Sequence, residues 1–145
     1  MRRETGHVNA ADAIQVASFR SALRHFLRAS EEIAQANGLT PRRHLLLLMI
    51  KGAPDGSERA TIGELTERLA LAQSTVTELV KRAEQAGLVE REWSPDDGRV
   101  AHLQLTAAGE RVLARVFQSH EAEREKLRTI LATPEYETAP LRSNT

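Results

Sequence analysis

The spacing of apolar side chains predicts a chain built mainly from helices. Between residues 12 and 37 apolar positions recur at close to the helical period, and Gly38 follows as a residue suited to a left-handed helix stop. Thr40 and Pro41 then pair as an N-cap and a first-turn residue, ahead of residues 45–50, which are all apolar. We therefore expect a long first helix and a central, buried second helix.

The next stretch predicts two helices joined by a tight turn and followed by a hairpin. Thr61 and Glu64 have the spacing of a capping box, so a short third helix is expected here. A fourth, amphipathic helix is expected from about Gln73 to Ala86. Residues 88–93 and 100–105 have the pattern of two short strands around a polar turn. The polar face of the fourth helix includes Gln73, Ser74, Thr75, Thr77, Glu78, Lys81 and Arg82.

A last helix is expected from Thr106, which caps it, as far as Pro134. It carries an apolar seam that is too extensive for a lone surface helix, so we expect the seam to pair with a second copy of the chain. The polar residues 134–145 are expected to form a disordered tail. The seam consists of Val112, Leu113, Val116, Phe117, Leu127, Ile130 and Leu131.

This order of elements is that of a winged helix-turn-helix, a mainly α fold with a small β-hairpin wing, whose second helix lies in the major groove of duplex DNA. We expect a single domain over residues 1–145, in which residues 57–106 form the DNA-binding lobe. Residues 11–53 together with 107–133 are expected to form a helical dimerisation region. At the wing tip we expect the Asp97 carboxylate to orient the Arg99 guanidinium into the minor groove.

Composition narrows the class of protein. Twenty Lys and Arg residues balance twenty Asp and Glu residues, which argues against a protein that holds nucleic acid by bulk charge. DNA binding must then rest on the placement of a few cations. The absence of cysteine excludes disulfides, cysteine-ligated zinc and thiol switches. No apolar run has the length of a membrane span and no signal-peptide core begins the chain, so we expect a cytoplasmic protein.

Other classes of function fit the pattern less well. The alternative is a winged helix that binds a protein without binding DNA, because residues 60–106 carry more carboxylates than cations. Arg99 and the hydroxyl-rich helix face favour a DNA groove over a protein interface. No catalytic triad, phosphate-binding glycine loop or short metal-ligand spacing is present, so we expect no enzyme activity, cofactor or metal site.

Several motifs, in the right order, resemble those of the MarR family of bacterial regulators over roughly residues 11–131. The wing motif consists of Asp97-Gly98-Arg99, five further residues and then Leu105-Thr106. Gly38-Leu39-Thr40-Pro41, Ser74-Thr75-Val76-Thr77 and Gly87-Leu88-Val89-Glu90-Arg91 are also similar to family motifs. The resemblance implies a homodimer built from the terminal helices, DNA reading by the Gln73–Arg82 face, wing insertion by Arg99 and, in many members, a small-molecule effector.

Three features depart from the family pattern. Ala72 stands where a capping Ser is common, which predicts a less stable start to the fourth helix. Glu78 and Lys81 have exchanged the usual signs of charge, and we expect them to pair across three residues and to alter base preference. A full sixth helix is expected to be missing, because only about a dozen residues follow Pro134.

The resemblance also implies a mechanism of regulation. Many members bind a small anionic aromatic molecule between the dimer helices and the winged helix and then release DNA. We therefore expect a repressor of a pseudo-palindromic operator, released by an aromatic acid. The alternative is that the candidate side chains are ordinary surface, core or interface residues. The candidates for this pocket are Arg24, His25, Arg28 and His44, whose cationic or hydrogen-bonding groups suit a carboxylate.

Overall fold

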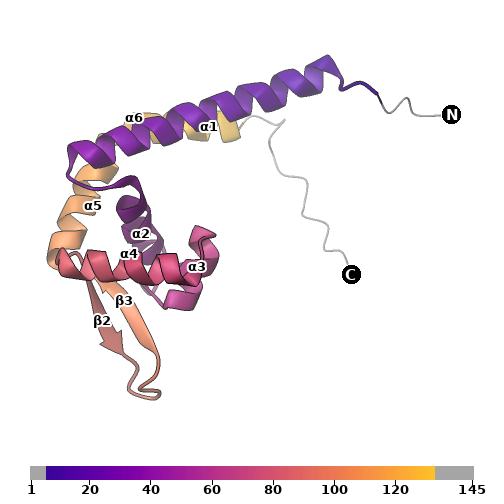
Figure 1. Cartoon of the computed structure of the whole chain (residues 1–145). Coiled ribbons are helices and arrows are strands. Elements are labelled where there is room, and N and C mark those ends of the chain that lie inside the picture. Colours follow the sequence, from indigo (N-terminus) through magenta and orange to yellow (C-terminus); the bar gives the residue numbers. More distant parts are fainter. Residues whose placement is uncertain (1–5, 133–145) are drawn as a thin grey trace. The chain divides into compact units, whose positions relative to one another are not determined.

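The computed structural model describes residues 6–132 of the chain (Figure 1). The chain divides into two compact units, one of residues Glu31–Ser119 and one of residues up to Ser30 together with those from His120 onward. The expected disordered tail lies outside the described residues. The proposed boundaries of a DNA-binding lobe and a dimerisation region are not tested by this division and stay a prediction.

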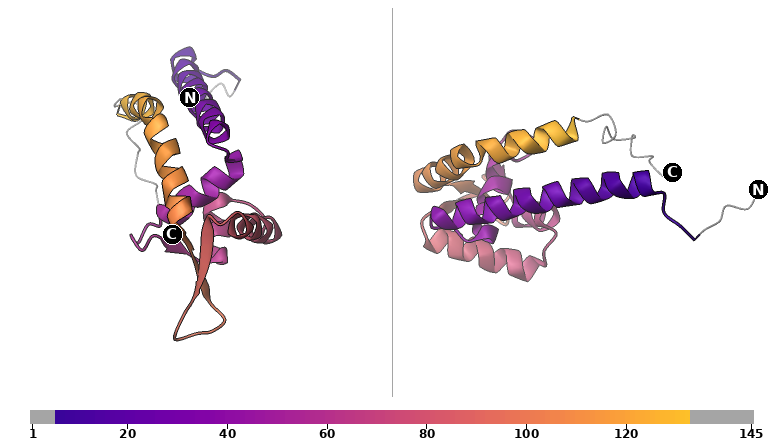
Figure 2. Two further views of the ribbon diagram at one scale, coloured as in Figure 1. Left: turned by 90° about the vertical axis from the view of Figure 1, so that its left-hand side faces the viewer. Right: turned by 90° about the horizontal axis from the view of Figure 1, so that it is seen from above.

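The larger unit contains the winged helix. Its helices, besides the end of α1 (Ala10–Ala36), are α2 (Pro41–Lys51), α3 (Ile62–Leu69), α4 (Gln73–Gln85) and α5 (Ala107–Ser119). Its strands are β1 (Arg59–Ala60), β2 (Val89–Trp93) and β3 (Ala101–Leu105). The predicted order of helix, helix and hairpin is confirmed, and the hairpin of β2 and β3 projects beyond the helices of its unit (Figure 2).

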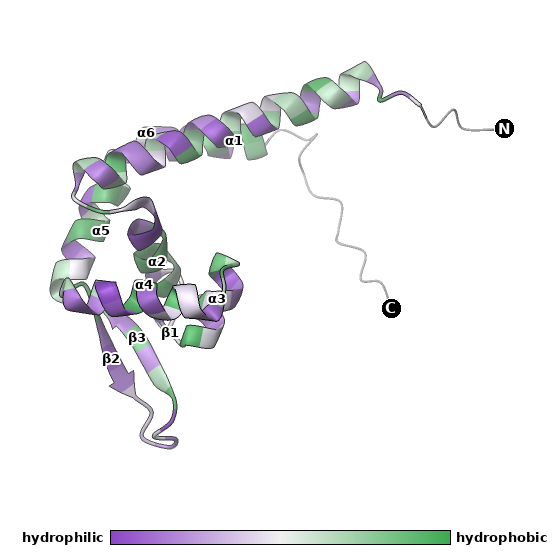
Figure 3. Ribbon diagram, viewed as in Figure 1, coloured by the Kyte–Doolittle hydropathy of each residue, from purple (hydrophilic) through white to green (hydrophobic). Residues whose placement is uncertain are grey.

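The aliphatic core of this unit explains why residues 45–50 are all apolar. Leu46, Leu47 and Ile50 of α2 are fully buried, and α4 packs Val76 and Val80 into the same cluster. Figure 3 shows α2 as hydrophobic beyond its first turn and α4 as striped by hydrophilic residues. Complete burial of one such aliphatic side chain contributes about 1.5–3 kcal/mol, so this cluster holds α4 firmly against α2.

The sheet has three antiparallel strands in the order β1-β3-β2. Val89 pairs with Leu105 and Trp93 with Ala101, which fixes the register of the wing. The strand β1, whose Ala60 pairs with Leu103, was not predicted. It is two residues long, and a segment of that length has no alternation that a sequence pattern can reveal.

The predicted helix ends are confirmed. The Thr40 hydroxyl accepts from the Arg43 N–H at the start of α2, and Thr61 and Glu64 form a complete capping box at α3. Gly87, which follows α4, has a φ of 74°, a conformation that a residue with a Cβ adopts only at a cost. These caps satisfy backbone groups that a helix end leaves without intrahelical partners.

The smaller unit shows where one prediction was wrong. The expected last helix from Thr106 to Pro134 is interrupted at His120, and its second part is α6 (Glu121–Leu131). The sixth helix that we expected to be missing is therefore present. Within this unit α1 and α6 run side by side in opposite directions (Figure 2). No helix of residues 6–132 is long and apolar enough to cross a membrane.

The apolar seam also differs from its prediction. Val112, Leu113 and Val116 are buried in the core of their own unit, so these three of the seven seam residues need no second chain. Phe117 and Leu131 remain 49% and 46% exposed. The helical period continued through His120, which concealed that α5 and α6 belong to different compact units.

Candidate nucleic-acid interface

The helix α4 separates a core face from a polar face. Val76, Val80 and Ala83 are fully buried, which fixes the rotation of the helix about its axis. Ala72 precedes it with no side-chain cap, as the sequence predicted. The opposite face is open to solvent and can lie in the major groove of DNA. It exposes Gln73, Ser74, Thr77, Glu78, Lys81 and Arg82, and Thr75 is half-buried.

The predicted pairing of Glu78 with Lys81 is wrong. The Glu78 carboxylate instead accepts a hydrogen bond from the Arg82 Nε at 3.2 Å, one helical turn away. Both side chains are more than half exposed, so this pair contributes little to folding. Its consequence is electrostatic: Glu78 holds one of the cations on the polar face and leaves Lys81 outside the pair.

The wing tip has the expected residues in a different arrangement. Asp97 Oδ1 accepts a hydrogen bond from the backbone N–H of Arg99 at 3.0 Å, so the carboxylate shapes the turn and does not hold the guanidinium. The bonds Ser94 N–H to Val100 C=O (2.9 Å) and Val100 N–H to Asp97 C=O (3.0 Å) close the turn. The Arg99 side chain is exposed and has no ion pair among the described residues.

Sequence reasoning missed two cations that lie beside α4. A groove of about 680 Å³ separates the first turn of α2 from the polar face of α4, and both Arg42 and Arg43 line it. The Arg43 Nε is buried and has no hydrogen-bond partner in the described chain. No local motif indicates a role for these residues, because the sequence pattern of α2 predicts a buried helix. The groove is lined by Thr40, Pro41, Arg42, Arg43, Ser74, Thr75, Glu78, Leu79 and Arg82.

Carboxylates hold several other cations of this unit. Arg68 pairs with Glu64 at 3.0 Å, and Arg91 of β2 pairs with Glu84 of α4 at 3.0 Å. Lys51 binds both Glu110 (2.9 Å) and Glu58 (3.0 Å), and the hydrogen bonds that it donates to these two carboxylates raise the pKa of Lys51. These ion pairs join α4 to the wing and α2 to α5. Each pair within residues 60–106 removes one cation and one carboxylate, so the acidic excess of this stretch remains.

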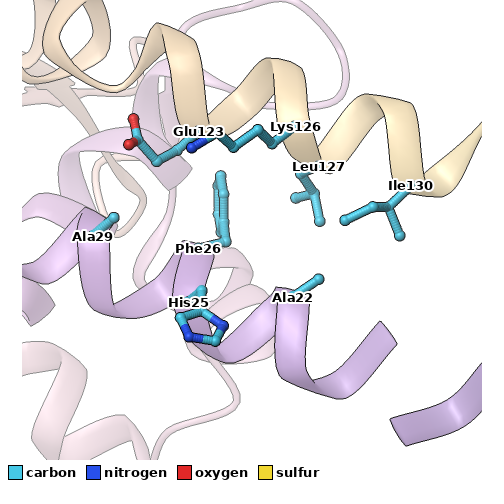
Figure 4. A pocket seen from close by; sticks show the side chains of 8 residues that line it. All are labelled: Ala22, His25, Phe26, Ala29, Glu123, Lys126, Leu127 and Ile130. Carbon is cyan, nitrogen blue, oxygen red and sulfur yellow. The ribbon is translucent and has the colours of Figure 1, made fainter. Parts of the chain in front are cut away.

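The four predicted pocket residues are divided between the two units, and their joint site stays a prediction. Arg24 and Arg28 are exposed on α1, whereas His44 is half-buried on α2 in the larger unit. His25 lines a pocket of about 210 Å³ between α1 and α6 (Figure 4). Its ring Nδ1 is 2.8 Å from the Ser21 carbonyl oxygen. The pocket is lined by Ala22, His25, Phe26, Ala29, Glu123, Lys126, Leu127 and Ile130.

Comparisons with known proteins agree on one class. Residues 37–100 match the MarR family. The chain is 33% identical over 110 residues to the uncharacterized HTH-type transcriptional regulator YsmB of Bacillus subtilis (strain 168), covering 73% of each chain. It is 29% identical over 101 residues to the HTH-type transcriptional regulator MhqR of the same organism, covering 70% of this chain and 67% of MhqR.

Solved structures give the same fold. AbsC, a MarR family transcriptional regulator from Streptomyces coelicolor, superposes with a TM-score of 0.70 at 22% identity, over 90% of this chain and 87% of that one. Sco3205, a MarR family transcriptional regulator from the same organism solved in complex with DNA, gives a TM-score of 0.67 at 24% identity, over 92% and 83%.

The fold and the arrangement of α4 and the wing define a transcriptional regulator of the winged helix-turn-helix class. The chain belongs to the MarR family. This membership confirms the resemblance that the wing motif and the flanking motifs indicated.

Proposed function

We propose that the chain acts in the cytoplasm as a homodimer that binds a pseudo-palindromic operator in duplex DNA, with α4 of each copy in one major-groove half-site. The observation that carries the proposal is that an exposed polar face of α4 and the exposed arginine of the wing belong to one compact unit. Exposed hydroxyl and amide side chains on α4 suit base edges and phosphates, and Lys81 adds a cation. Arg99 at the wing tip suits a narrow minor groove.

The groove beside α4 extends this interface to the DNA backbone. Arg42, Arg43 and the N-terminus of α2 surround a space into which a phosphate fits, and the positive end of the helix dipole favours an anion there. The buried, unpartnered Nε of Arg43 supplies a donor for such an oxygen. Glu78 opposes this attraction, so we expect modest affinity that depends on salt.

The smaller unit supports the dimer. Val16 and Leu27, three turns apart on one face of α1, are 56% and 51% exposed, and an exposed apolar face of this kind suits a protein partner. A second copy that covers this surface would remove it from water, and two copies would place two α4 helices on one DNA.

The proposed effector is a small aromatic acid. Without this effector the protein is proposed to stay on its operator and repress the adjacent gene. His25, Phe26 and Lys126 line one pocket, and a cation beside a ring suits an aromatic carboxylate. Glu123 lines the same pocket, and its carboxylate opposes the binding of any anion, so we expect weak affinity for the acid. An effector acts only through its different affinities for the two states of the dimer, so it must bind DNA-free protein more tightly.

The test is selection from a pool of random duplex DNA at moderate salt. We expect the chain to enrich a two-fold symmetric site, and Arg99→Ala to bind that site at least about tenfold more weakly, as one groove contact typically contributes 1–3 kcal/mol. Arg128→Ala, which removes an exposed arginine of α6, is the matched control and should keep full affinity. If no sequence is enriched at any salt concentration, the hypothesis that the winged helix binds a protein instead of DNA becomes the better explanation.

A further inference from the structure

The described chain contains one buried polar residue, His120, and it lies where α5 ends and α6 begins. The residue is 5% exposed, and its backbone (φ −99°, ψ 6°) leaves the helical conformation. Its side chain does not cap α6. A residue without a capping role at a helix break ordinarily points to solvent, so the burial of this imidazole requires another explanation.

The imidazole packs against α1. The centroids of the His120 and Phe26 rings are 4.5 Å apart with planes tilted by 44°. The α1 positions one turn either side of Phe26 are Ala22, Leu23, Ala29 and Ser30, so this face of α1 presents no titratable group. The last turn of α5 is likewise free of titratable side chains from Val116 to Ser119.

The buried ring is tolerated in this position only while it is neutral. Its Nε2 is buried and has no hydrogen-bond partner in the described chain. Burial lowers the pKa of His120, the Phe26 backbone and Glu123 oppose this shift, and Arg124 reinforces it. A neutral imidazole tolerates one unpartnered nitrogen, whereas an imidazolium must satisfy two donors and loses far more by desolvation.

We propose that His120 is a proton-operated latch, which holds α6 against α1 when its ring is neutral and releases it when the ring takes up a proton. The sign follows from linkage: the unfolded chain, with an ordinary histidine, takes up the proton at higher pH than the native state. Stability is therefore complete above the ordinary histidine pKa and is lost as the pH falls below it. The latch works at the pH range in which histidine is the natural switch.

The consequence is confined to the smaller unit. Phe26 also lines the pocket between α1 and α6 with Leu127 and Ile130 (Figure 4). Departure of the His120 ring would therefore remove one ring contact of Phe26. The apolar faces of α1 and α6 then lose their fixed spacing. If the dimer forms through these helices, as the proposed function states, mild acid weakens the dimer and with it operator binding.

The test combines two measurements on the full chain that do not require DNA. Histidine NMR follows the titration of each imidazole, and urea unfolding gives the free energy of unfolding between pH 7.5 and pH 5. We expect the pKa of the His120 ring to lie below that of an ordinary histidine, and the wild type to lose more stability with falling pH than His120→Gln. His25→Gln, which removes an exposed histidine of the same unit, should lose as much as wild type.

Either measurement can overturn the latch. It is wrong if His120 titrates together with the exposed histidines, or if His120→Gln loses the same stability between pH 7.5 and pH 5 as wild type. Should His120→Gln not fold, His120→Phe keeps a ring beside Phe26 and takes up no proton, and the same comparison applies. Sedimentation at both pH values then measures the oligomeric state. Neither measurement uses DNA, so the latch can be tested even if the proposed DNA binding is wrong.

Discussion

Replacing Glu78 by Gln should strengthen DNA binding without altering the fold. Glu78 lies on the exposed face of α4 and holds Arg82 at 3.2 Å. The two side chains are 56% and 65% exposed, so loss of this pair costs only about 0.3–0.5 kcal/mol of stability. Removal of the carboxylate frees Arg82 for a phosphate and takes away a charge that repels one.

The salt dependence of DNA affinity measures how many phosphate contacts the Glu78→Gln substitution adds. Each additional phosphate contact steepens the plot of log affinity against log salt by about 0.9, so two copies on one operator should steepen it by about 1.8. Fluorescence anisotropy at several salt concentrations measures this slope, and urea unfolding measures stability. Glu125→Gln is a matched control, because Glu125 holds Arg128 at 2.9 Å in an equally exposed pair on α6. Weaker binding by Glu78→Gln would refute the reasoning and indicate that the carboxylate accepts a hydrogen bond from a base.

Two further substitutions test the scaffold. Gly109→Ala should destabilise the protein by about 1–3 kcal/mol, because the new Cβ would lie 2.1 Å from the Leu88 carbonyl oxygen. Urea unfolding measures this loss of stability. Unchanged stability would show that α5 moves away at no cost. Ala72→Ser should stabilise the protein by about 1 kcal/mol, since α4 begins without a side-chain cap. The same assay measures that gain, and a loss of stability would mean that the Ser hydroxyl does not reach the free N–H groups of the first turn.

Local chemistry made much of the fold predictable. Thr40, Thr61 with Glu64, and Gly87 mark helix ends by interactions that span only a few residues, and each forms as expected. The break at His120 was not predictable, because it involves no Gly or Pro, and the contact of its ring with Phe26 is tertiary. The strand β1 was missed for a related reason, since its two residues are held by pairing with β3.

The candidate site divides in the same way. The polar face of α4 follows from helical periodicity, whereas the partner of Glu78 depends on rotamers that place Arg82 within reach and leave Lys81 outside it. Arg42 and Arg43 belong to the interface only because α2 packs beside α4. The role of Asp97 in the turn became clear from its hydrogen bond to the Arg99 N–H.

The central claim is that two wings of a symmetric dimer enter the DNA beside two α4 helices. Because the chain contains no cysteine, Asp96→Cys gives a single attachment point for a DNA-cleaving iron chelate on the exposed wing. On the selected operator we predict two clusters of strand cuts, placed symmetrically about its centre, and none from the same reagent on Glu121→Cys of α6. A single cluster, or equal cutting along the whole duplex, would contradict the account.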